Sequence, residues 1–186
     1  MAHARTPRRA WIDQGLQALA EGGPDAVRVE VLAQSLGVTK GGFYGYFANR
    51  AALLEEMLTT WECEVTETVI SEVEAGAGQA PARTKLRRLF AIADAEHATM
   101  GVAVDLAIRD WARRDLQVAA RLRRVDSRQM DYLRSLFSEF CPEAIEVEAR
   151  CLVVMSIRIG DHLIPAEQGR HRRAEIVRDV LNRLLV

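Results

Sequence analysis

A short segment near residue 40 combines groups that bind phosphate with residues that leave room for it. Lys40, Tyr44 and Tyr46 carry one ammonium group and two phenols, all able to donate hydrogen bonds to phosphate oxygens. Three glycines stand among them in the stretch KGGFYGYF, although each costs a helix roughly 1 kcal/mol relative to alanine. Glycine also lets a backbone approach another surface closely. The segment therefore predicts a helix end laid against a nucleic-acid backbone.

The aromatic residues of this segment allow two interpretations. Phe43 and Phe47 are four residues apart and can anchor the opposite face of the helix to a core. Alternatively, all four aromatic residues from 43 to 47 form an ordinary core and the glycines form a loop, since aromatic clusters at helical spacing are usually core.

The residues before this segment predict how it is positioned. Between 29 and 36, apolar residues recur at offsets of 3, 4 and 7, which is the spacing of one face of a short helix. Gly37 is expected to end that helix with a positive φ. Thr39 is a candidate N-cap for the next helix, because its hydroxyl can accept a hydrogen bond from a free amide. The pattern indicates two short helices joined by a tight turn.

The whole stretch from Arg28 to Leu54, RVEVLAQSLGVTKGGFYGYFANRAALL, resembles the DNA-binding domain of the tetracycline-repressor (TetR) family of transcriptional regulators. The pattern of that family is a short helix ending in Ala/Leu-Gly-Val-Ser/Thr, followed by Lys/Arg, two small residues and Phe/Leu-Tyr. A variable residue, a second aromatic residue or His, Phe, and Asn/Ser-Lys/Arg then precede Leu-Leu. The resemblance covers the first quarter to third of the chain. The remainder is similar to the family only in its length and its helical character.

The resemblance implies an all-α fold with two domains. Residues 1–48 are expected to form an N-terminal three-helix bundle with a helix-turn-helix that binds DNA. Residues 49–186 are expected to form a larger helical domain for effector binding and dimerisation. The implied function is a homodimeric repressor, released from a roughly palindromic double-stranded operator by an unknown small molecule. The alternative is a helical small-molecule-binding or protein-interaction module without a DNA role.

Two departures from the family pattern bear on DNA recognition. Gly42 and Gly45 stand where the family often has a hydroxyl residue and a larger polar residue, so fewer side chains are available to read bases. Arg28 occupies the place of a frequent capping Thr. A cation at a helix N-terminus is unfavourable by a few tenths of a kcal/mol, so Arg28 is better explained by a phosphate contact.

The predicted DNA-binding residues follow from these observations. Base readout is expected mainly from Lys40 and the edge of Tyr44. Phosphate contacts are assigned to Lys40, Tyr44, Tyr46 and Arg50, further backbone contacts to Arg28 and Thr39, and close approach to Gly41 and Gly42.

The other elements expected around this site are helices. A basic arm with Arg5, Arg8 and Arg9 leads into a helix over about 7–21, which Gly22-Gly23-Pro24 ends. Asn49 is expected to cap a long helix over about 49–74, the candidate lever between the domains. No strand pattern is visible in the sequence. Further helices are predicted at about 82–99, 102–113, 116–140, 142–163 and 170–186, with Gly101 as a break.

The last two helices carry more apolar residues than one buried face needs, which favours a two-fold interface between copies. The alternative is that the apolar residues of both helices are buried within one chain. The predicted dimer interface comprises Leu152, Met155, Ile159, Val177, Leu181 and Leu184.

Large side chains between residues 61 and 160 could line an effector pocket, with polar residues as handles. Core packing is the simpler explanation for any one of them. The candidates are Trp61, Phe90, His97, Asp105, Arg109, Trp111 and Tyr132.

Composition and motifs restrict the alternatives. Residues 1–50 carry six Lys and Arg against four acids, whereas residues 51–82 carry seven glutamates and no Lys or Arg, which supports a phosphate-facing N-terminal part. The three cysteines lack a pairing pattern, and the apolar runs are far shorter than the ~18 residues of a membrane span. Motifs such as HExxH, GxSxG and GxxxxGK[ST] are absent. We therefore expect a cytoplasmic protein that is not an enzyme, with no cofactor, no metal site and no membrane partner.

Overall fold

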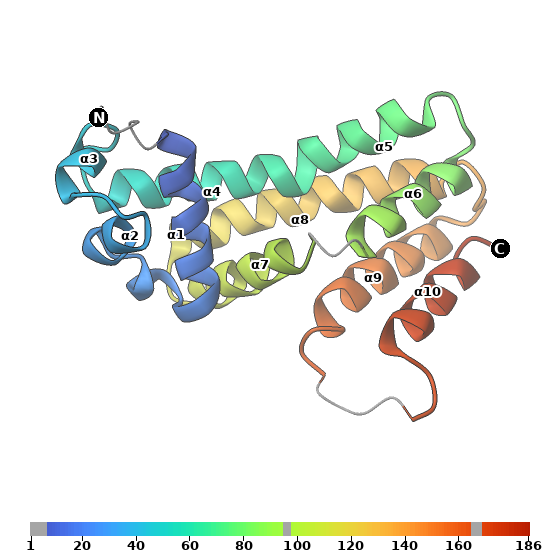
Figure 1. Ribbon diagram of the computed structural model, residues 1–186. Coiled ribbons are helices and arrows are strands. Elements are labelled where there is room, and N and C mark those ends of the chain that lie inside the picture. Colours follow the sequence, from blue (N-terminus) through green and yellow to red (C-terminus); the bar gives the residue numbers. More distant parts are fainter. Residues whose placement is uncertain (1–6, 95–97, 165–168) are drawn as a thin grey trace. The chain divides into compact units, whose positions relative to one another are not determined.

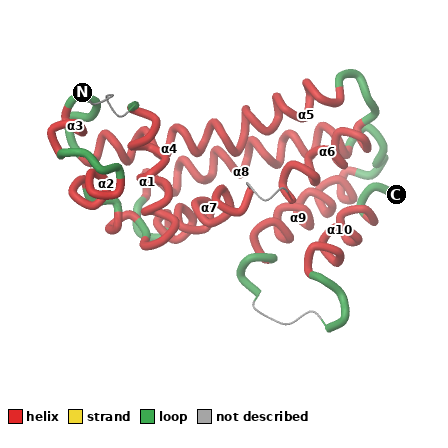
Figure 2. Tube along the Cα trace, viewed as in Figure 1, coloured by secondary structure: helices red, strands yellow, loops and turns green. Residues whose placement is uncertain are grey.

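The computed structural model describes residues 7–94, 98–164 and 169–186. All regular secondary structure within these ranges is helical (Figures 1 and 2). The predicted all-α fold is confirmed. None of the described helices is long and apolar enough to cross a membrane. The elements are α1 (Arg8–Gly22), the 3-10 turn η1 (Pro24–Ala26), α2 (Val29–Ser35), α3 (Lys40–Tyr44), α4 (Arg50–Cys63), the π-helical turn η2 (Glu64–Thr68), α5 (Val69–Ala77), α6 (Ala82–Asp94), α7 (Ala98–Ala112), α8 (Leu116–Phe137), α9 (Ala144–Gly160) and α10 (Arg173–Arg183).

The chain packs into two compact units. Unit 1 comprises Met1–Glu64 and Ala103–Leu122, and unit 2 comprises Val65–Val102 and Arg123–Val186. These are units of packing, and they do not decide where a functional domain begins. The predicted domain boundary between residues 48 and 49 therefore stays a prediction.

Helices α1, α2 and α3 of unit 1 gather around the start of α4 (Figure 1). Each helix supplies large side chains to one buried core, as their apolar spacing predicts. Helices α1 and α4 approach closely at Gly15, where an added Cβ would lie 2.6 Å from the Met57 sulfur. The core residues include Trp11, Leu16, Leu19, Leu32, Phe43, Leu53 and Met57.

The long helix predicted over 49–74 is present with one irregularity. Asn49 caps it as predicted, because its side-chain oxygen accepts from the Ala52 amide at 2.9 Å. The π-helical turn η2 interrupts the α-helical hydrogen bonding between α4 and α5. In unit 2 the Val65 carbonyl of this turn accepts from the Gln129 side chain at 2.8 Å. Apolar spacing at 3 and 4 residues does not register one inserted residue, so the sequence pattern could not show this turn.

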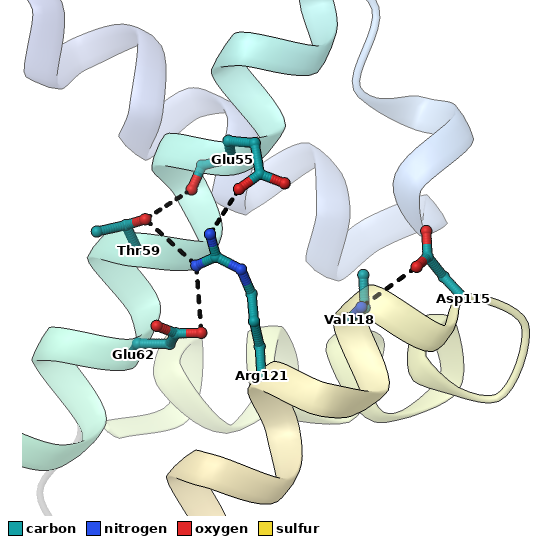
Figure 3. A network of polar contacts seen from close by, with 6 residues as sticks. All are labelled: Glu55, Thr59, Glu62, Asp115, Val118 and Arg121. Carbon is teal, nitrogen blue, oxygen red and sulfur yellow. Dashed lines mark hydrogen bonds and ion pairs between the residues drawn. The ribbon is translucent and has the colours of Figure 1, made fainter.

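The acidic stretch from 51 to 82 pairs with arginines of other helices. Arg121 of α8 donates to Glu55 at 2.5 Å and to the Thr59 hydroxyl at 3.3 Å, and it forms an ion pair with Glu62 at 3.2 Å (Figure 3). The Arg121 side chain is only 19% exposed, so this contact fixes the first turns of α8 against α4.

Arginines of α1 meet the same acidic helix. Arg8 donates to Glu56 at 2.9 Å, and Arg9 forms an ion pair with Glu64 at 2.5 Å. Both arginines lie in α1, within the helix predicted over 7–21. Glu56 lies in α4, and Glu64 is the first residue of η2. Many of the glutamates that follow residue 50 therefore form ion pairs within the chain. For this reason the change of charge at residue 50 is weaker support for DNA binding than the sequence indicates.

Unit 2 has its own hydrophobic core, which joins α6, α8, α9 and the chain end around Leu86, Phe137 and Cys151. One predicted break is wrong: α7 begins at Ala98 and continues through Gly101, since a single glycine costs a helix only about 1 kcal/mol. The predicted helix over 82–99 is described only to Asp94.

Candidate nucleic-acid interface

The turn between α2 and α3 has the predicted geometry. Gly37 adopts φ of 66°, in the left-handed region that favours glycine. The Gly37 amide donates to the Gln34 carbonyl at 3.0 Å, and the Val38 amide donates to the Ala33 carbonyl at 2.9 Å. These bonds satisfy the last carbonyls of α2 and fix the direction in which α3 leaves.

One prediction about this turn is wrong. Thr39 does occupy the N-cap position of α3 with an extended backbone, but its hydroxyl accepts no capping bond from the described amides of the helix. The Thr39 side chain is exposed instead. A hydroxyl in this state is available to a phosphate oxygen without first breaking a cap.

Helix α3 is held by one aromatic residue and exposes another. Phe43 is fully buried and meets Trp11 edge-on, with ring centroids 5.4 Å apart, while it stacks on Phe47 at 5.2 Å. Tyr44 is 62% exposed and Tyr46 is half-buried. The interpretation in which all four aromatic residues form a core is therefore wrong for Tyr44. Helix α3 ends at Tyr44, earlier than the predicted Phe47, as three glycines in eight residues favour.

The glycines of α3 are not required by the interior of the protein. A Cβ added at Gly41 would lie 3.6 Å from the Thr39 hydroxyl, and one at Gly42 would lie 3.7 Å from the Trp11 ring, both ordinary van der Waals distances. Both glycines are exposed. Packing inside the protein therefore does not explain these glycines, and the absence of side chains leaves room for another surface to approach closely.

The cations assigned to DNA differ in their surroundings. Arg28 is exposed at the N-cap position of α2 and makes no capping bond there. The Lys40 ammonium lies 2.6 Å from the Glu30 carboxylate, and this hydrogen bond holds the pKa of Glu30 below its ordinary value. Glu30 was not among the predicted site residues. Glu30 lies two residues after Arg28 and ten residues before Lys40, and this spacing offers no pattern that links the two helices.

Arg50 is engaged inside unit 1. Its Nε donates to the Val27 carbonyl at 2.6 Å, and an Nη donates to the Pro24 carbonyl. Both carbonyls belong to the turn that connects α1 with α2. This geometry ties the start of α4 to that turn, which is a different role from the phosphate contact that the sequence predicts.

The predicted ligand residues divide between the two units. In unit 1, Trp61 is buried, and its indole N–H has no hydrogen-bond partner among the described residues. The Asp105 carboxylate is buried and accepts from Arg109 at 3.0 Å, while Trp111 is half-buried. A buried ion pair and an unsatisfied indole are polar groups that a ligand could address, although each also fits a helical core.

In unit 2, Tyr132 donates to Glu74 at 2.8 Å, and Lys85 forms an ion pair with the same carboxylate at 2.6 Å. Desolvation by burial, with the Glu74 carboxylate alongside, raises the pKa of the Tyr132 phenol. Phe90 packs against the hydrophobic core of unit 2. His97 lies outside the described residues. The described candidates thus belong to two different units, and their role in ligand binding stays a prediction.

The predicted dimer residues are mostly covered by their own chain. Leu152 is 63% exposed, whereas Met155 is buried. Ile159 and Val177 are half-buried, and Leu181 and Leu184 pack against the core of unit 2. The apolar side chains that α9 does expose are Ile145, Leu152 and Val153, which follow a spacing of 7 and 8 residues. That spacing was visible in the sequence.

The N-terminal part of the chain matches a known family. Residues 12–57 match the model of the bacterial regulatory proteins of the tetR family. No curated protein sequence matches this chain. The matched range contains α2, α3 and their turn, so the resemblance inferred from residues 28–54 is confirmed.

Solved structures extend the similarity to nearly the whole chain. The regulator FadR from Bacillus subtilis, in complex with stearoyl-CoA, is 17% identical, with TM-score 0.68 over 96% of this chain and 98% of that one. AibR, in complex with isovaleryl coenzyme A and operator DNA, is 16% identical, with TM-score 0.70 over 95% and 97%. A TetR-family regulator from Rhodococcus sp. is 17% identical, with TM-score 0.69 over 96% and 98%. These similarities establish the fold.

Proposed function

We propose that this chain, which carries a TetR-family DNA-binding domain on a TetR-family fold, is a homodimeric transcriptional repressor released from its operator by a small molecule. The observation that carries the DNA-binding role is the geometry of α3. Phe43 is buried and anchors the helix, while Tyr44 and the exposed Gly41 and Gly42 leave its outer face open for a DNA backbone. Such a helix enters the major groove in helix-turn-helix proteins.

The proposed contacts follow the exposure of each group. Lys40, Tyr44 and Tyr46 bind phosphates, and Gly41 and Gly42 permit close approach. Base readout falls to Lys40 and the edge of Tyr44. Arg28 and Thr39 are both exposed, and they add contacts with the DNA backbone. We assign Arg50 to positioning the α1–α2 turn, because its guanidinium already donates to two carbonyls there. A protein that binds chromosomal DNA acts in the cytoplasm, and we propose that location.

The proposed dimer uses the exposed apolar face of α9. Ile145 is 77% exposed and Leu152 is 63% exposed, an unusual exposure for apolar residues of one helix face. A second copy related by a two-fold axis buries the same residues on both chains. Two copies of α3 then read half-sites about one helical turn apart, which is why the operator is expected to be roughly palindromic.

The proposed effector is a small molecule that binds the helical part of the chain from α4 onward. The buried Asp105–Arg109 pair and the indole of Trp61 are its candidate polar partners. Because two proteins of this fold were solved with acyl-CoA molecules, acyl-CoAs of different chain length are the first compounds to test. Release requires only that the effector binds more tightly to the dimer conformation in which the distance between the two α3 helices does not fit the operator.

The test is fluorescence anisotropy with a labelled duplex from immediately upstream of this protein's own coding sequence. Wild type should bind this duplex more tightly than a random one, and Tyr44→Ala should abolish the difference. Tyr44→Phe is the matched control that removes only the hydroxyl, and thermal melting checks that both variants fold. Equal affinity of wild type for both duplexes excludes autoregulation. If wild type binds neither duplex, the chain is a helical binding module without a DNA role.

A further inference from the structure

The Lys40 ammonium is already engaged when the protein is free of DNA. It lies 2.6 Å from the Glu30 carboxylate, and the two side chains are 55% and 57% exposed. Glu30 lies in the first turn of α2, and Lys40 is the first residue of α3. The contact therefore bridges the two helices of the helix-turn-helix on its solvent-exposed surface.

Glu30 is charged in this contact. The hydrogen bond from Lys40 is the main cause that lowers the pKa of Glu30, and Arg28 contributes through its charge. Its carboxylate also lies in the first turn of α2, where a negative charge is favourable. An exposed ion pair of this kind is weak, because water and salt screen both charges. A phosphate can therefore displace Glu30 from Lys40, but it must compete with it.

We infer that Glu30 is an intramolecular competitor of DNA phosphate for Lys40, and that it sets how strongly the helix-turn-helix binds any DNA backbone. The inference rests on the proposed function. A phosphate that takes Lys40 leaves an ionised carboxylate beside the DNA backbone, where like charges repel. Non-specific binding depends almost entirely on cation–phosphate contacts, so it is the binding mode that Glu30 weakens most visibly.

The size of the effect follows from counterion release. Each neutralised phosphate contributes about 0.9 to the slope of log affinity against log salt. Glu30→Gln leaves Lys40 without its competitor and should steepen the slope by up to about 0.9. With this change in slope, the affinity of Glu30→Gln relative to wild type rises by up to about eightfold for each tenfold dilution of salt.

The experiment is a double-mutant cycle on a labelled duplex of random sequence. Wild type, Glu30→Gln, Lys40→Ala and the double variant are titrated at several salt concentrations. Glu30→Gln should bind more tightly and with a steeper salt slope than wild type. In the Lys40→Ala background the same substitution should gain much less, because no ammonium remains to be released.

Controls separate this competition from a general charge effect. Glu21→Gln removes the same charge from α1, where Glu21 meets only the neutral Gln17 among the described contacts, and it should change the slope less. Glu30→Ala is a second variant in case the amide of Gln finds a partner of its own. Thermal melting checks the fold of each protein. An NMR titration without DNA should show the pKa of Glu30 rising in Lys40→Ala.

The outcomes are distinct. If wild type binds DNA but Glu30→Gln matches it, the inference is wrong and the proposed function stands. Equal gains in both Lys40 backgrounds likewise overturn the inference, because Glu30 then acts as a distant charge. If wild type binds no duplex at any salt concentration, the proposed function fails and the inference falls with it.

Discussion

Replacing Arg50 with alanine separates two roles for its guanidinium. Arg50 is the first residue of α4, and it donates to the carbonyls of Val27 and Pro24, at 2.6 Å in the case of Val27. These carbonyls belong to the turn that leads into α2. If Arg50 acts by holding this turn, its loss lowers the stability of unit 1. If it acts on phosphate, its loss lowers the number of ionic contacts with DNA.

The magnitude follows from the two hydrogen bonds. A hydrogen bond to a charged group contributes about 1.5–3 kcal/mol, and two bonds from one guanidinium are not additive. The Val27 side chain is fully buried beside its carbonyl, so water replaces the lost donor imperfectly. We expect Arg50→Ala to lower the free energy of unfolding of unit 1 by about 2 kcal/mol. Arg50→Lys keeps the charge but loses the planar fork, so it should recover only part of this loss.

The assay is urea unfolding followed by tryptophan fluorescence. Trp11, Trp61 and Trp111 all lie in unit 1, so the signal reports that unit. The midpoint should fall while the dependence on urea stays unchanged, as expected for a loss of native stability alone. The salt slope of DNA binding should equal that of wild type. The reasoning is refuted if stability changes by less than about 0.5 kcal/mol while the slope falls by about 0.9.

Two further predictions concern the rest of the chain. Leu152→Arg should convert the proposed dimer to a monomer in sedimentation experiments. The control Leu116→Arg, at a site that is 87% exposed in unit 1, should leave the oligomeric state unchanged. Equal behaviour of both variants would show that α9 is not part of the interface. Burial raises the pKa of the Cys151 thiol to about 11, so at pH 8 it stays protonated, and iodoacetamide should alkylate the exposed Cys63 quickly but Cys151 only after unfolding. Equal rates for the two thiols in the folded protein would contradict the burial of Cys151.

The features that the sequence predicts well are set by neighbours in the chain. Gly37 ends α2 with a positive φ, Asn49 caps α4, and Phe43 turns inward while Tyr44 turns outward. Each depends on residue types within one or two helical turns. The apolar spacing therefore predicts where the helices lie in the sequence and which face of α3 is exposed.

The features that the sequence missed depend on residues far apart in the chain. Arg50 reaches carbonyls more than twenty residues earlier, and Arg121 meets glutamates about sixty residues earlier. A long charged side chain has many partners of suitable sign within reach, and only the packed fold selects one. For this reason the sequence does not show the partners of Arg50, nor the contact between Lys40 and Glu30.

The ligand residues stay a prediction. Large side chains at helical spacing line cores and pockets alike, and spacing does not distinguish the two. Tyr132 illustrates this, because its hydroxyl donates to Glu74 while its ring packs against the hydrophobic core of unit 2.

The most direct test of the central claim is a selection of duplexes from a random library by the wild-type protein. The account predicts enrichment of one inverted repeat, with half-sites about one helical turn apart, and loss of this enrichment when Tyr44→Ala replaces wild type. A single half-site would contradict the dimeric arrangement. Enrichment that is absent, or that is the same with Tyr44→Ala, would contradict the claim that α3 recognises DNA.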